Sequence, residues 1–131
     1  MQYMMLIYFD ENASSPSEAE RAQCYADSAA FAQQLHAKGQ YIMAAPLHPT
    51  ATATSVRAQE GKRVVTDGPF AETREQLGGF FLVEAANLDE AIEIAKGLPS
   101  AKWGTVEIRP VVQVSGLPES PAVDLAASRS T

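Results

Sequence analysis

Two apolar stretches dominate the pattern of hydrophobic and polar positions along the chain. Residues 3–9 (Tyr-Met-Met-Leu-Ile-Tyr-Phe) and 80–85 (Phe-Phe-Leu-Val-Glu-Ala) carry aromatic and branched side chains at nearly every position. A strand with one solvated face alternates apolar and polar residues, so runs that are apolar on both faces predict strands covered on both sides. A shorter run at 41–45 and an alternating run at 105–114 predict two further strands. Pro110 indicates that the last strand lies at a sheet edge or contains a bulge.

Helical periodicity appears twice between these strands. A candidate capping box of Ser15 and Glu18 precedes a segment rich in Ala and Gln that continues to Lys38. The second helix follows a similar cap at Asn87, and its apolar residues recur at helical spacing until Gly97. Each predicted helix therefore lies between two predicted strands.

Residues 53–58 and 62–66 flank a Gln-Glu-Gly turn and predict a β-hairpin. The order of elements is β-α-β, a hairpin, then β-α-β. This order predicts an α+β fold of the ferredoxin-like split βαβ type with an inserted hairpin, spanning residues 1–114. Residues 115–131 are rich in Ser, Pro and Ala without periodicity, which is typical of a disordered C-terminal tail.

The count of helices leaves one sheet face without a cover. Two helices can cover one face, yet residues 3–9 and 80–85 are apolar on both faces. Soluble monomers rarely expose an apolar patch of that size. A second copy of the chain, packed through a two-fold interface, is the simplest cover and predicts a homodimer. The alternative is that the hairpin or the tail folds over the face.

Composition and charge narrow the classes of partner. The 131 residues include 16 acidic and 10 basic side chains, for a net charge of −6. An acidic surface repels phosphate, so nucleic acid and anionic membranes are excluded as predicted partners. The single cysteine, Cys24, forms no intrachain disulfide, and no apolar run is long enough to span a bilayer, so we expect a cytoplasmic protein. Neither metal-ligand spacing nor a glycine-rich phosphate loop occurs, so no metal and no cofactor are predicted.

The sharpest local motif is the segment from Asp67 to Phe70, Asp-Gly-Pro-Phe, which turns the chain after a strand. In one interpretation the Asp67 carboxylate accepts amide hydrogen bonds of its own turn. In the other it is an acid–base group at the mouth of a cleft, with His48 of a preceding loop as its proton-transfer partner. His48 is otherwise an exposed loop histidine. Arg57, unless it is only solvated surface, supplies positive charge nearby, and Pro69 and Phe70 complete the predicted binding residues.

Residues 65–81 (Val-Thr-Asp-Gly-Pro-Phe-Ala-Glu-Thr-Arg-Glu-Gln-Leu-Gly-Gly-Phe-Phe) closely resemble the signature of the YCII-related, DGPF-domain family. The resemblance extends over about residues 1–113. Four shorter stretches carry the rest of it: 3–8, 51–57, 88–91 and 106–110. It implies a dimeric α/β barrel, in which two ferredoxin-like units pack sheet to sheet.

The resemblance also implies a candidate site and two functions. YciI-like relatives carry a His–Asp pair in a cleft that is suspected of catalysis, although no reaction is established. Asp67 matches the Asp of the signature, and His48 lies in the loop after the second strand. The first hypothesis is therefore a small-molecule acid–base enzyme that uses Asp67 and His48. The second is a non-catalytic small-molecule-binding or regulatory module, because members of this family are often encoded beside extracytoplasmic-function sigma factors.

Overall fold

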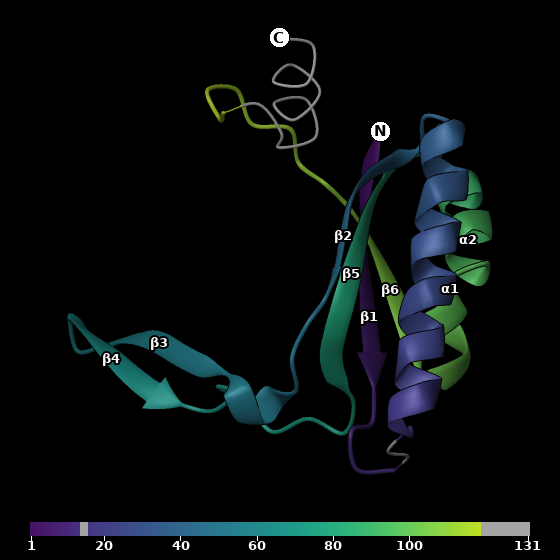
Figure 1. Ribbon diagram of the computed structural model, residues 1–131. Coiled ribbons are helices and arrows are strands. Elements are labelled where there is room, and N and C mark those ends of the chain that lie inside the picture. Colours follow the sequence, from purple (N-terminus) through teal and green to yellow (C-terminus); the bar gives the residue numbers. More distant parts are fainter. Residues whose placement is uncertain (14–15, 119–131) are drawn as a thin grey trace, which may run out of the picture.

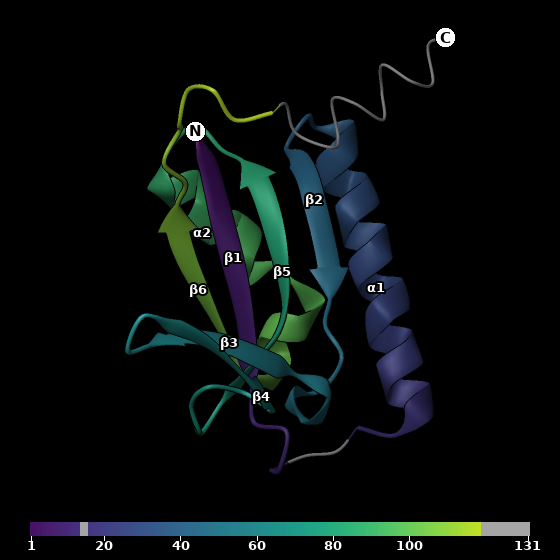
Figure 2. The same cartoon turned by 90° about the vertical axis from the view of Figure 1, so that its left-hand side faces the viewer.

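Four antiparallel strands form one sheet, and both helices lie on the same face of it (Figures 1 and 2). The computed structural model describes residues 1–13 and 16–118. The strand order is β2-β5-β1-β6, which is the ferredoxin-like order and confirms the predicted α+β fold. The strands are β1 (Gln2–Phe9), β2 (Tyr41–Pro46), β5 (Gln76–Glu84) and β6 (Thr105–Pro110), and the helices are α1 (Glu18–Ala37) and α2 (Leu88–Lys96).

Alternation along the central strands divides their side chains between two faces. Tyr3, Met5 and Ile7 of β1 are buried, as are Phe81 and Val83 of β5, and all five belong to the core beneath the helices. The helices complete the core with side chains from one face each: Leu35, Ala91, Ile94 and Ala95. The two apolar runs therefore supply the core with every second residue only.

The other residues of those runs form what we call the open face, which points away from the helices. Register places Met4 opposite Leu82 and Leu6 opposite Phe80, and Met43 of β2 pairs with Leu82 from the other side. All five side chains are half-buried by their neighbours in the sheet. No helix or strand of residues 1–13 and 16–118 packs over them (Figure 1).

The inserted hairpin consists of β3 (Thr54–Gln59) and β4 (Lys62–Asp67), after a short 3-10 helix, η1 (Thr50–Thr52). It forms a separate two-stranded sheet. It extends from the end of the main sheet on the side opposite the helices (Figure 1). Nearly all its residues are exposed, so the hairpin does not cover the open face, and that alternative is wrong. The other alternative involves the tail of residues 115–131, of which residues 119–131 are outside the described residues.

The start of α1 differs from the prediction. The cap is Ser17, whose hydroxyl accepts from the Glu20 amide at 3.1 Å, while Glu20 accepts from the Ser17 amide. Ser15, the predicted cap, lies outside the described residues. Both pairs fit the capping-box spacing, and the helix begins at the second of them. The Asn87 cap of α2 is confirmed, because its side chain accepts from the Glu90 amide at 2.9 Å.

Two strand boundaries also differ from those expected. β5 begins at Gln76 rather than at residue 80, because Gly78 and Gly79 are part of the strand. A Cβ on Gly79 would lie 3.0 Å from a backbone oxygen of β2, so glycine allows the two strands to approach closely. β6 ends at Pro110 rather than at residue 114, on an edge strand as its proline indicated.

Candidate functional site

The turn after β4 is fixed by backbone geometry and by hydrogen bonds to β3. Gly68 has a φ of 100°, a conformation that residues with a side chain rarely adopt. Its amide donates to the Ala53 carbonyl at 2.7 Å, and its carbonyl accepts from the Ser55 hydroxyl at 2.7 Å. The chain therefore turns sharply after Asp67, and the turn is tied to the beginning of the hairpin.

The carboxylate of Asp67 takes no part in this turn. It is exposed, and within the described residues it makes no hydrogen bond and no ion pair. The interpretation that Asp67 accepts amide hydrogen bonds of its own turn is therefore wrong. His48 is also exposed and without a hydrogen bond in the described part of the chain, so the two side chains are not bonded to each other.

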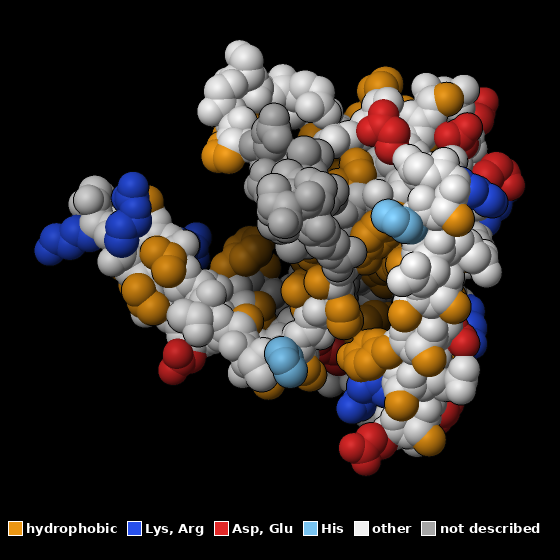
Figure 3. Space-filling model, turned by 45° about the horizontal axis from the view of Figure 1, so that its top comes forward, with side chains coloured by type: hydrophobic (Ala, Val, Ile, Leu, Met, Phe, Trp, Pro, Cys, Tyr) orange, Lys and Arg blue, Asp and Glu red, His pale blue; other side chains and the backbone are white. Residues whose placement is uncertain are grey.

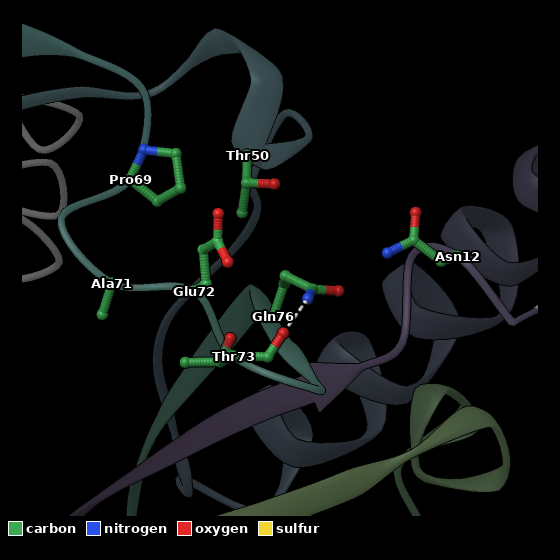
Figure 4. Close-up of a pocket in the computed structure, with 7 residues that line it drawn as sticks. All are labelled: Asn12, Thr50, Pro69, Ala71, Glu72, Thr73 and Gln76. Carbon is green, nitrogen blue, oxygen red and sulfur yellow. Dashed lines mark hydrogen bonds between the residues drawn. The ribbon is translucent and has the colours of Figure 1, made fainter.

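A cavity of about 280 Å³ lies where the Asp67 turn meets the His48 loop (Figure 4). Thr50, two positions after His48, and Pro69, two positions after Asp67, both line it. Its remaining lining residues are Asn12, Ala71, Glu72, Thr73 and Gln76. The Glu72 carboxylate points between Pro69 and Thr50 (Figure 4). The cavity thus offers hydroxyl, amide and carboxylate groups, while Asp67 and His48 belong to the loops that border it and are not themselves among its lining residues.

Hydrogen bonds connect the three loops around this cavity. The Glu11 carboxylate accepts from the Thr50 amide at 3.1 Å and from the Thr50 hydroxyl at 2.7 Å. The Glu11 amide donates to Gln76 Oε1 at 2.8 Å. Gln76 Nε2 in turn donates to the Thr73 carbonyl at 2.6 Å (Figure 4). Glu11 and Gln76 therefore hold the His48 loop and the loop after Asp67 in place.

The other predicted binding residues are dispersed. Register pairs Asp67 with Thr54 and Arg57 with Val64, so Arg57 lies on the opposite face of the hairpin from Asp67. The Phe70 side chain is 79% exposed. Of the three predicted binding residues, Pro69 lines the cavity, and Arg57 and Phe70 do not.

The groups that sequence reasoning missed are Glu11, Glu72 and Gln76. Glu11 belongs to a turn-rich stretch and Gln76 to the strand start that was expected as loop, so no spacing linked them to Asp67. Cys24 is half-buried in a groove between α1 and a second 3-10 helix, η2 (Pro99–Trp103). Over residues 1–13 and 16–118, no group of three His, Cys, Asp or Glu side chains could hold a metal ion. No helix in the described ranges is long and apolar enough to cross a membrane.

Comparison with known proteins adds a family, a relative and a fold. Residues 1–115 match the family described as YCII-related domain. A protein of Rhizobium meliloti (strain 1021), described as uncharacterised, is 40% identical over 114 residues, which cover 85% of this chain and 92% of that protein. A solved structure of 5-chloro-2-hydroxyhydroquinone dehydrochlorinase from Burkholderia phenoliruptrix AC1100, in complex with 2,5-dihydroxybenzoquinone, has a TM-score of 0.50. It is 16% identical and covers 87% of this chain and 96% of its own, a likeness of fold alone.

Proposed function

Because the chain belongs to the family of YCII-related domains, we propose that it binds a small molecule and performs acid–base chemistry with Asp67 and His48. The observation that carries this proposal is that the loops of both residues border one cavity at the hairpin end of the sheet. Loops held by a rigid sheet are common positions for catalytic side chains. The solved structure of the same fold holds a small ring compound, which supports this class of ligand.

The two groups have complementary roles in the proposed reaction. The Asp67 carboxylate accepts a proton from a carbon or oxygen of the substrate, and protonated His48 gives one to the oxygen or leaving group that becomes negative. Asp67 therefore gains one proton and His48 loses one, so the substrate and the product carry the same number of protons. The network through Glu11 and Gln76 positions the loops without contacting the substrate.

We also propose that the working form is a homodimer packed through the open face. Met4, Leu6, Phe80, Leu82 and Met43 give that face an apolar surface which the helices leave uncovered. A second copy removes this surface from water, and each square ångström of apolar area so buried is worth about 25 cal/mol.

A thermal-shift screen of metabolites followed by turnover assays tests the enzymatic proposal. Asp67→Asn keeps the size of the side chain and should reduce turnover of an identified substrate by about 10²–10⁴-fold with the fold intact. His48→Gln should reduce it as well. Glu93→Gln, which changes an exposed carboxylate on α2, is the matched control and should turn over substrate like the wild type. Wild-type turnover by Asp67→Asn would contradict the proposal.

The second candidate function is a binding module without catalysis. It is favoured by the absence of a hydrogen bond between Asp67 and His48 in the described residues. In that case a ligand from the same screen stabilises the protein but is recovered unchanged after prolonged incubation. The sigma-factor partner implied by the family resemblance stays a prediction, for which co-purification of the two proteins is the direct test.

A further inference from the structure

The hairpin of residues 54–67, which we call the arm, exposes an apolar face to water. Val56 and Val65 stand directly opposite each other in the register, and 63% and 66% of their surfaces are exposed. A two-stranded hairpin is marginally stable in water when it packs against nothing. Within the described residues the arm has no substantial packing partner. Its apolar face therefore needs a surface that a single copy of the chain does not provide.

The position of the arm determines where such a surface can come from. The arm leaves the main sheet on the side of the open face, opposite the helices (Figure 1). Hydrophobic side chains are visible both along the arm and in the hollow between arm and sheet (Figure 3). Any body that packs on the open face lies beside the arm as well.

The charge of the arm differs in sign from that of the rest of the chain. The arm has three basic residues, Arg57, Lys62 and Arg63, and two acidic residues, so its net charge is +1. The whole chain carries −6, which leaves −7 on the rest of it. Basic side chains gather toward the free end of the arm (Figure 3). Arg63 shares the face of Val56 and Val65. Arg57 and Lys62 lie on the opposite face. Because two chains of net charge −6 repel each other, a second copy is favoured instead by the apolar open face beside the arm, on which the proposed homodimer already places one.

We propose that the arm clasps a second copy of the chain, with the face of Val56 and Val65 packed against it. This inference rests on the proposed homodimer. Residues 63, 65 and 67 alternate onto one face of β4, so Asp67 at the base of the arm faces the second copy as well. Each site is then enclosed between two copies, which explains why the Asp67 carboxylate is solvated and unpaired in the single chain.

Sedimentation equilibrium of arm variants tests the clasp. Val56→Lys combined with Val65→Lys should raise the dissociation constant of the dimer by about tenfold or more, because burial of both valines is lost. Val64→Lys, on the opposite face of the same strand, is the matched control and should change that constant by less than about threefold. Equal constants for the double variant and the control would overturn the clasp while leaving the homodimer intact. A monomeric wild type would overturn both.

A mixed sample of two labelled copies tests the reach of the arm directly. One unlabelled copy carries Cys24→Ser and a nitroxide at Gln59→Cys near the end of the arm, and the other copy is ¹⁵N-labelled wild type. The clasp predicts broadened amide signals in the ¹⁵N-labelled copy. Dimers without any such broadening would overturn it, even if the valine variants weaken association.

Discussion

At the scale of single residues, the candidate site depends more on backbone geometry than on side-chain hydrogen bonds. Gly68 turns the chain with a positive φ, and Asp67 beside it makes no hydrogen bond in the described residues. Nothing in the turn therefore requires a carboxylate at position 67 for stability. The exposed carboxylate is therefore available to a bound molecule, as the proposed function requires.

Gly68→Ala should cost about 1–3 kcal/mol of folding free energy through backbone strain alone. A Cβ at Gly68 would meet nothing within 4 Å, so no packing clash adds to the cost. Gly104→Ala is the contrasting variant, because its Cβ would collide with the backbone of Tyr8. We expect a larger loss there, measured for both variants by urea unfolding. Equal losses of unfolding free energy in the two variants would contradict the expectation that a backbone collision costs more than backbone strain alone.

At the scale of elements, α1 depends on its cap because it contributes little to the core. Leu35 is its one buried residue within the described core. The apolar and polar residues of the helix are only weakly separated onto different faces. Helices in proteins gain most of their stability from packing, so a weakly packed helix relies more on its ends. The Ser17–Glu20 capping box satisfies amides that would otherwise lack partners at that end.

Ser17→Ala should therefore destabilise the protein by about 1 kcal/mol. Ser28→Ala, in the interior of the same helix, serves as the control and should be neutral or slightly stabilising, since alanine is the better helix former. Thermal unfolding of both variants measures the difference. A Ser17→Ala protein as stable as the wild type would mean that water replaces the cap at no cost.

The same cap predicts a dependence on pH. The amide and hydroxyl of Ser17 lower the pKa of Glu20 below its ordinary value of 4.5. A carboxylate with a lowered pKa in the folded state contributes stability that is complete above its unfolded pKa and is lost as pH falls through the folded pKa. Melting temperatures recorded from about pH 6 downward should therefore fall less steeply for Glu20→Gln than for the wild type. Parallel curves would contradict this contribution.

At the scale of the whole molecule, the feature that needs explanation is the surface left uncovered. The open face and the arm point to the same side, and the helices occupy the other (Figures 1 and 2). No helix or strand in the described part of one chain packs on either surface, and the proposed second copy would cover both at once.

Leu82→Lys places a charge in the middle of the open face and should abolish association, leaving a monomeric or insoluble chain. Leu88→Lys, at an exposed position that begins α2, should leave the assembly unchanged. Sedimentation at micromolar concentration distinguishes the two outcomes. Dimers of Leu82→Lys with wild-type affinity would exclude the open face as the interface.

Deletion of residues 116–131 should lower the melting temperature by no more than a few degrees. The last described residues are poorly buried, with Val112, Val114 and Leu117 at 79%, 56% and 67% exposure, so this described segment removes little apolar area from water, and we expect the same of the residues that follow it. Differential scanning calorimetry of the shortened chain checks this. A large loss of stability would show that the tail covers part of the sheet.

The order of elements, the fold class and the family could be predicted from the sequence because they depend on local information. The apolar run of residues 3–9, the cap at Asn87 and the Asp-Gly-Pro-Phe turn are each contained in a few consecutive positions. The sequence could not predict that Ser17 rather than Ser15 caps α1, because both serines fit the same spacing. The early start of β5 could not be predicted either. Gly79 allows β5 to approach β2 closely, and a distance between two strands is not visible in the sequence.

The cavity was determined only by the tertiary structure. Glu11, Thr50 and Gln76 are far apart in the sequence, and they meet because antiparallel pairing brings the loops after β1 and β2 and the start of β5 to one end of the sheet. The same holds for the separation of Arg57 from Asp67, which depends on the register of the hairpin. The sequence by itself determined which side chains alternate along each strand, because that follows from the geometry of the backbone. Which faces are covered, and which loops meet, follows from packing between distant segments, and only the folded chain decides it.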